Sequence, residues 1–276
     1  MMAGRESRAR LRRLEKRLRE LHDAYYSDAA NEAAVILQYL RVLAEARGVE
    51  RLRHAEPERG PRLHLGAGDH RLEGWTNVDL LGTPAVDVRA DCGAPLPFRD
   101  SSVAFIHCED LLEHLDLGGG KTLLAECFRI LRPGGVLRLL TPDLERLIHA
   151  VYQRRETRHL RWCAERLSAD GPCEALNMHL RMNGEHRFVY DGARLREVLA
   201  ALGYSVRRVR WNRSAHPELR FLDLRDFGLN LFLEATKPAK PTGSSSPPPK
   251  ASPRDAATEP SARTHPSRAP KRKRFS

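Results

Sequence analysis

Cysteine is scarce in this chain, and its spacing excludes two common frameworks. The five cysteines are odd in number and include no pair separated by two residues; they are Cys92, Cys108, Cys127, Cys163 and Cys173. Disulfide-stabilised secreted folds and zinc knuckles both need closely patterned cysteines. We therefore expect a reduced chain and assign no metal ligand from the sequence.

Long apolar runs are also missing. No stretch approaches the ~20 consecutive apolar residues that span a bilayer. Residues 1–20 are basic and lack the apolar segment of a secretory signal. We expect a soluble, cytoplasmic protein without a membrane partner.

Positive charge is plentiful but confined to the two ends. The chain carries a formal net charge of +11. Residues 1–20 hold eight Arg/Lys and three Glu, a net +5, and residues 237–276 hold ten Arg/Lys and two acidic residues, a net +8, which leaves −2 for the middle. Contact with nucleic acid is therefore expected only through the basic ends.

Composition divides the chain into three parts. Residues 239–276 are rich in Pro, Ser and Lys/Arg and have little to bury, which predicts a disordered tail. Residues 1–58 form a basic helical extension, and residues 59–238 form the globular domain. An apolar stripe in the extension (Leu11, Leu14, Leu18, Leu21 and Tyr25) predicts a helix that docks on the domain or, alternatively, pairs two copies as a homodimer. A second apolar helix is expected over AAVILQYLRVLAEA.

Strand and helix patterns alternate from Arg62 onward. Strands are predicted in RLHLG, TNVDLL, VDVRAD, SVAFIHC, VLRLLTP, YSVRRVRW and LNLFLEATKP, and helices in EDLLEHL, GKTLLAECFRILRPGG and DGARLREVLAALG. Such alternation favours an α/β fold with a doubly wound, mostly parallel sheet covered on both faces.

The turn after the first predicted strand indicates a nucleoside site. Gly66 and Gly68 allow a ligand to approach the backbone, and Asp79, at the end of the second strand, can accept hydrogen bonds from ribose hydroxyls. A dinucleotide fingerprint requires a third glycine where this chain has Arg71, and no Gly-Lys-Ser/Thr follows for a P-loop. The ligand is therefore expected to lack a pyrophosphate, which disfavours a nicotinamide-dependent oxidoreductase.

Three stretches resemble the successive motifs of class I S-adenosylmethionine-dependent methyltransferases. They are LHLGAGDHRLEGWTNVDL, ADCGAPLPFRDSSVAFIHCEDLLEHL and ECFRILRPGGVLRLLTPDLERLI, whose LPF, LEH and LRPGG blocks resemble the type 11 branch. The resemblance covers about residues 61–238 and implies a Rossmann-like, seven-stranded sheet. The chain departs from the family pattern at Ala104, where an acidic residue is usual, and at His70, where a small residue is common.

The same resemblance implies S-adenosylmethionine as the cofactor. The expected contacts are Gly66, Ala67, Gly68, Asp79, Leu80, Asp91, Cys92 and Cys108. The glycine turn would face the methionine part, Asp79 would hold the ribose and Leu80 would pack on the adenine. Asp91, with the backbone of Cys92, would meet the adenine amino group.

Candidate catalytic residues follow the fourth strand. Glu109 and Asp110 are expected near the transferred methyl group, although they could simply favour the dipole of a helix there. We retain Asp110 as a catalytic candidate. Glu113 and His114 belong to the LEH block, which the family shares across different substrates, and this generality favours a structural role.

A long segment, residues 143–191, is predicted to cap the acceptor site. Its candidate side chains are His179, Arg181, His186 and Tyr190. His186 is the predicted general base because an imidazole can accept a proton near neutral pH. Tyr190 would orient the acceptor. For Arg181, simple exposure to solvent is as good an interpretation as a functional role.

Together, these features predict a methyltransferase that acts on an unidentified acceptor. A small molecule or a sugar-type metabolite is favoured because the domain is not basic. The alternative is a non-catalytic scaffold or binding protein that keeps the fold and contacts nucleic acid or another anionic partner through its ends.

Overall fold

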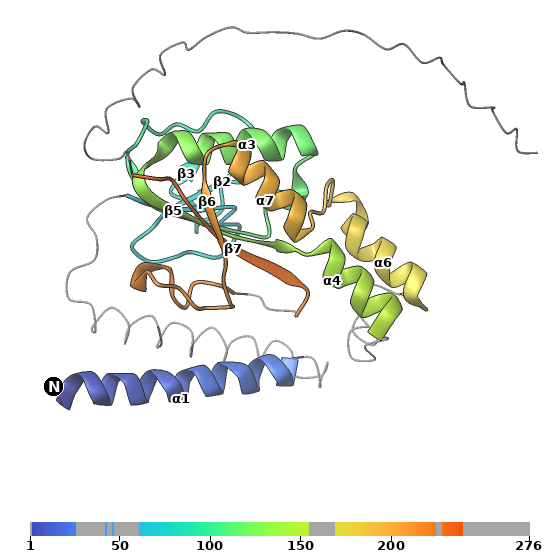
Figure 1. Cartoon of the computed structure of the whole chain (residues 1–276), viewed down its shortest axis with the longest axis horizontal. Helices are drawn as coiled ribbons and strands as arrows, with labels where there is room; N and C mark the ends of the chain where they lie inside the picture. The colour runs from blue at the N-terminus through green and yellow to red at the C-terminus, as the bar shows by residue number, and fades with distance from the viewer. Residues whose placement is uncertain are drawn as a thin grey trace, which may run out of the picture. The chain divides into compact units, whose positions relative to one another are not determined.

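The computed structural model describes residues 2–25, 42, 46, 61–154, 169–224 and 228–239 (Figure 1). The described residues all belong to one compact unit, which spans Met1–Lys240. The predicted tail lies almost wholly outside the described residues, as does most of the second N-terminal helix, so both stay predictions.

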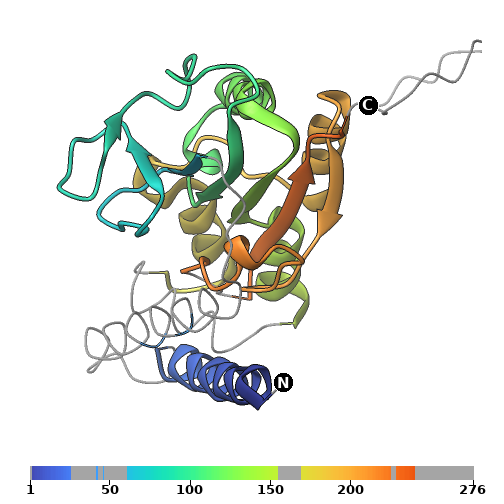
Figure 2. The same ribbon diagram turned by 90° about the vertical axis from the view of Figure 1, so that its left-hand side faces the viewer.

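A seven-stranded sheet organises the domain, in the order β3-β2-β1-β4-β5-β7-β6. The strands are β1 (Arg62–Leu65), β2 (Thr76–Asp79), β3 (Val88–Arg89), β4 (Val103–Glu109), β5 (Leu131–Pro142), β6 (Ser205–Arg208) and β7 (Asn230–Thr236). The first five pair in parallel, whereas β7 runs antiparallel to both β5 and β6. Figure 2 shows β6 and β7 as neighbouring orange and orange-red arrows of opposite direction. The predicted mostly parallel sheet is confirmed.

Helices α3 (Leu117–Ile130) and α7 (Gly192–Ala201) lie on the same side of the sheet (Figure 1). Their apolar residues share one buried cluster with β1 and β4, as Leu123, Leu199 and Ile106 illustrate. Side chains alternate along a strand, so Phe105 turns to the other face, where it packs with Trp75. The central strand β4 is buried along almost its whole length and is mostly apolar, as expected for a strand covered on both faces.

The chain after β4 differs from the expected helix over residues 109–115. Asp110 adopts a positive φ of 48°, and only a short 3-10 turn, η2 (Leu112–His114), follows. Helix α3 begins at Leu117, where the side chain of Asp116 accepts a hydrogen bond of 2.7 Å from the Gly119 backbone N–H. A left-handed residue cannot continue an α-helix, so β4 ends in a tight turn that brings η2 to the edge of the sheet.

Helix α1 (Met2–Tyr25) buries its leucine stripe within the same chain. Leu11, Leu14, Leu18 and Leu21 share a cluster with Phe221. Glu15 adds two hydrogen bonds, of 2.8 and 2.7 Å, from the Arg213 guanidinium. The stripe therefore docks on its own chain, as predicted; pairing with a second copy stays a prediction.

The predicted cap segment consists of short helical pieces in the part that the structure describes. These are α4 (Leu144–Ile148), the π-helical η3 (His149–Arg154), α6 (Pro172–Arg181) and the 3-10 turn η4 (Met182–Gly184). Residues 155–168 lie outside that part.

No helix among the described residues is long and apolar enough to cross a membrane.

Candidate functional site

A cavity of about 430 Å³ opens at the carboxyl ends of the parallel strands. Ligands of open α/β sheets bind at this edge, and the volume suits a small molecule. Five residues predicted from the sequence line the cavity, namely Gly66, Asp79, Leu80, Asp91 and Cys92. The structure thus brings together residues spread over 27 positions of the chain.

The glycine turn fixes the Asp79 carboxylate at the cavity wall. The Gly68 backbone N–H donates a 2.9 Å hydrogen bond to Asp79 Oδ2, and the Leu81 backbone N–H donates a 2.8 Å hydrogen bond to Oδ1. Each carboxylate oxygen can accept more than one hydrogen bond, so Asp79 keeps capacity for ligand hydroxyls.

Gly66 cannot readily be replaced. Its φ is +73°, and a Cβ built on it would lie 3.0 Å from the Leu111 Cβ. The backbone therefore needs glycine both for its conformation and for its contact with the segment after β4.

Gly66→Ala should lower the free energy of unfolding by about 1 to 2 kcal/mol from the left-handed conformation alone, with a further loss from the Leu111 contact. Gly134→Ala is the matched control, because Gly134 has a φ of +80° but nothing within 4 Å of its added Cβ. Urea unfolding of both variants measures the difference. Equal losses would show that the Leu111 contact does not constrain the turn.

Two aspartates of the cavity wall act on Cys92, which lines the same cavity. Burial, together with the charges of Asp79 and Asp91, raises the pKa of Cys92 to about 12. The thiol is therefore neutral at physiological pH and acts as an apolar wall rather than as a nucleophile. Asp91 is held by a 2.8 Å hydrogen bond from the Gly93 backbone N–H.

Three predicted cofactor contacts do not line this cavity. Cys108 is only 1% exposed and packs in the core beneath the sheet edge, where burial raises its pKa well above the ordinary value. Ala67 is 2% exposed, and the N–H of Gly68 is directed to Asp79. Cys108 belongs to the buried apolar cluster of the domain, and the predicted cofactor contacts of these three residues stay predictions.

The cavity has a second group of lining residues that the sequence did not assign to the cofactor. They are Gly93, Leu111, His114, Leu115, Asp116, Gly119 and Arg187. Arg187 directly follows His186 in the predicted cap. This position is the one feature of the sequence that could have indicated Arg187 as a residue of the site. Arg187 brings a positive charge to the cavity, and Asp116 adds a third carboxylate to those of Asp79 and Asp91.

Two backbone hydrogen bonds attach the cap segment to the LEH block. The N–H groups of Arg187 and Phe188 donate to the Glu113 carbonyl at 2.8 and 3.2 Å. His114 lines the cavity, and its Nδ1 lies 3.2 Å from the Glu185 carbonyl oxygen. The LEH block therefore joins the cavity to the cap, and the structural role favoured from the sequence stays a prediction.

His186 stands beside His114, with their ring centroids 5.1 Å apart. Its Nδ1 lies 2.7 Å from the His179 carbonyl oxygen, so Nδ1 carries the proton and donates it. Burial is the main cause that lowers the pKa of His186, and the neighbouring His114 adds to it. In the neutral ring, Nε2 is the nitrogen left to accept a proton or bind an ion.

The other predicted acceptor-side residues are dispersed. Tyr190 is 1% exposed and its hydroxyl packs against Gly120, so it does not line the cavity, and its predicted role in orienting the acceptor lacks support. His179 is buried in α6 and Arg181 is exposed on it. Asp110 does not line the cavity either, but its charge acts on His186.

Residues 75–139 match the family described as "Methyltransferase domain", of the type 11 group. This stretch of the chain is therefore similar to a methyltransferase type 11 domain. The cofactor that this domain implies is S-adenosylmethionine.

One curated protein similar to this chain is a protein of Mycolicibacterium smegmatis named as a probable S-adenosylmethionine-dependent methyltransferase. It is 42% identical over 60 residues, which cover 22% of this chain and 23% of the relative. The match thus spans about a quarter of the relative's length.

Solved structures of similar fold include S-adenosylmethionine-dependent methyltransferases from Methanosarcina mazei and Archaeoglobus fulgidus. The first is 15% identical, with a TM-score of 0.41, and the match covers 68% of this chain and 97% of that one. The second is 14% identical, with a TM-score of 0.42 and coverages of 71% and 94%.

Proposed function

We propose that this chain transfers a methyl group from S-adenosylmethionine to a small-molecule or sugar-type acceptor. The observation that carries the proposal is the convergence of Gly66, Asp79, Asp91 and Cys92 on one cavity. S-adenosylmethionine supplies an activated methyl group on a sulfonium, so the protein has chiefly to hold and align the reacting partners.

The cavity residues fit the chemical groups of this cofactor. Asp79 can accept hydrogen bonds from ribose hydroxyls, and Leu80, which is 55% exposed, offers an apolar surface for the adenine. Asp116 and Arg187 supply opposite charges, which suit a ligand that carries both an amino and a carboxylate group.

The acceptor is proposed to enter beside His114, His186 and Asp110. A hydroxyl acceptor must lose its proton by the transition state, and Nε2 of His186 is an atom that could take it. A small or sugar-type acceptor is favoured over nucleic acid because residues 21–236 carry a net −2, whereas the excess positive charge lies at the ends.

Calorimetric titration of the full chain with S-adenosylhomocysteine tests the cofactor assignment. A transfer screen with methyl-labelled S-adenosylmethionine and fractionated small metabolites then seeks the acceptor. Saturable binding of one molecule per chain is the expected result. Absence of binding in the folded protein would favour the alternative of a non-catalytic scaffold that contacts an anionic partner through its basic ends.

Asp79→Ala should weaken S-adenosylhomocysteine binding by roughly 1.5 to 3 kcal/mol, or about 10- to 150-fold, because ligand hydroxyls lose a charged acceptor. Asp69→Ala is the matched control, since Asp69 lies exposed in the same turn and does not line the cavity. The same titration measures both variants. Unchanged affinity in a folded Asp79→Ala protein contradicts the ribose assignment.

A further inference from the structure

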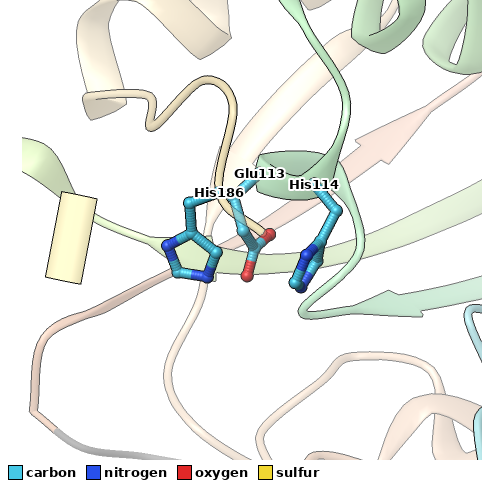
Figure 3. A group of neighbouring side chains, drawn as sticks. All are labelled: Glu113, His114 and His186. Carbon is cyan, nitrogen blue, oxygen red and sulfur yellow. The ribbon is translucent and has the colours of Figure 1, made fainter. Parts of the chain in front are cut away.

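Glu113, His114 and His186 form a compact cluster at the wall of the cavity. Each offers one potential metal-ligand atom, and these atoms all lie within 4.8 Å of one another. Figure 3 shows the Glu113 carboxylate between the two imidazole rings. The cluster joins η2 to the segment that follows η4, which lie more than 70 residues apart in the chain.

Both imidazoles are held by the backbone through the same ring nitrogen. Nδ1 of His114 lies 3.2 Å from the Glu185 carbonyl oxygen, and Nδ1 of His186 lies 2.7 Å from that of His179. A carbonyl only accepts, so each Nδ1 donates and each Nε2 keeps its lone pair. Histidines that bind metals through one nitrogen are typically oriented in this way, by donating the other ring N–H to a carbonyl or carboxylate.

The carboxylate of the cluster is also oriented. Glu113 is 1% exposed, and the Thr141 hydroxyl donates a 3.0 Å hydrogen bond to its Oε2. The Glu113 carbonyl accepts the backbone N–H groups of Arg187 and Phe188, so the two halves of the cluster are tied together. The cluster is therefore a built arrangement and not a chance meeting of mobile side chains.

The surrounding charge favours a cation. The carboxylates of Asp110 and Glu185 both act on the His186 ring. Arg187, the cationic residue next to His186, lines the same cavity, where three aspartates outnumber it.

We infer that Glu113, His114 and His186 bind a divalent transition-metal ion. Two imidazoles and one carboxylate suit Zn²⁺, Mn²⁺ or Fe²⁺ better than they suit Ca²⁺ or Mg²⁺, which prefer all-oxygen sites. Ligand atoms around a tetrahedral ion with bonds of ~2.1 Å lie about 3.4 Å apart, so the side chains need to close by at most about 1.4 Å. Small side-chain rotations suffice, because the three groups already converge.

The role of the ion, which rests on the proposed function, is to activate the acceptor hydroxyl. His114 belongs both to the cluster and to the cavity wall, so an open coordination position faces the space where the acceptor is proposed to enter. An acceptor hydroxyl bound to the ion has a lowered pKa and releases its proton to water. His186 is then a ligand through Nε2 rather than the general base.

Metal binding can be measured without cofactor or acceptor. The full chain, stripped with a chelator, is titrated calorimetrically with ZnCl₂ and MnCl₂, and bound metal is counted by elemental analysis after dialysis. We expect one ion per chain and a weakening of at least about 100-fold in each of His114→Ala, His186→Ala and Glu113→Gln. His149→Ala is the control, since His149 lies on η3 outside the cluster and should leave binding unchanged.

Thermal unfolding and S-adenosylhomocysteine titration report whether each variant is folded. Glu113 is buried, so a change there can unfold the protein. His186→Ala is then the deciding variant, because the His186 ring is only partly buried. No bound ion in the wild-type chain, or full binding in a His114→Ala/His186→Ala double variant, overturns the metal site. Zinc binding without S-adenosylhomocysteine binding overturns the proposed function alone, and the reverse result overturns the metal site alone.

Discussion

Asp223→Ala is expected to lower the free energy of unfolding by about 3 to 5 kcal/mol, because it leaves a buried guanidinium without its main partner. Arg138, in the middle of β5, is 0% exposed and forms a two-point ion pair with Asp223, including a 2.6 Å hydrogen bond from Nε to Oδ1. Its Nη1 donates to Glu234 Oε1 at 3.0 Å. A charge of this kind is stable in a core only while its partners remain.

The pKa of Asp223 reflects the same interaction. Burial alone raises it, but the charge and hydrogen bonds of Arg138 outweigh burial and hold the pKa well below the ordinary value. A lowered folded-state pKa stabilises the protein at pH values above the unfolded-state pKa, and the contribution is lost as the pH falls through the folded-state value. The difference in the free energy of unfolding between the wild-type chain and Asp223→Ala should therefore disappear only in strong acid.

Asp100→Ala is the matched control for this prediction. Asp100 pairs with Arg129 at 2.6 Å, but its side chain is 76% exposed. An exposed pair contributes at most about 1 kcal/mol. Differential scanning calorimetry should show a loss of melting temperature of roughly 6 to 20 °C for Asp223→Ala and little change for Asp100→Ala. Similar losses in the two variants contradict the assignment of a buried ion network.

The strands and their mostly parallel pairing could be predicted further than individual side-chain environments. Apolar residues recur at a period of about 2 residues in strands and about 3.6 residues in helices, so the sequence distinguishes the two kinds of element. Their alternation along the chain predicted a mostly parallel sheet. Arg138 and Glu234, however, each interrupt an apolar strand, and nothing in the sequence pairs them. Only the antiparallel register of β5 and β7, which sets them opposite each other, shows that they compensate.

Local conformation explains the main error in the predicted elements. EDLLEHL has good helix-forming residues, yet Asp110 takes a left-handed conformation and the helix is replaced by a turn. Packing at the sheet edge overrides the weak preference of so short a segment. This turn is what places His114 on the cavity wall.

The cofactor side of the site was more predictable than the acceptor side. Asp79 ends a strand, and Gly66 and Asp91 lie within two residues of a strand end, so the strand pattern alone brings them to one edge of the sheet. His186 meets His114 only because the cap folds back and hydrogen-bonds to the LEH block. Such long-range contacts have no periodic signature, which is why the sequence indicated no metal site.

His186→Ala is expected to lower turnover on the order of 100-fold or more, because the variant removes the atom that takes the acceptor proton or holds the ion that promotes its loss. S-adenosylhomocysteine affinity should stay nearly unchanged, since His186 does not line the cavity. The measurement is the rate of methyl transfer to the acceptor found in the screen, with His149→Ala as the control. Loss of S-adenosylhomocysteine binding in the folded variant would move His186 into the cofactor site.

Comparison with the two other members of the cluster separates the possible roles of His186. If the three residues act through one ion, His114→Ala and Glu113→Gln should each reduce turnover about as much as His186→Ala, and combining them should add little, because residues that act as a unit are not additive. A lone general base would concentrate the loss in His186→Ala. Wild-type turnover in His186→Ala would contradict both roles and return this histidine to a purely structural position in the cap.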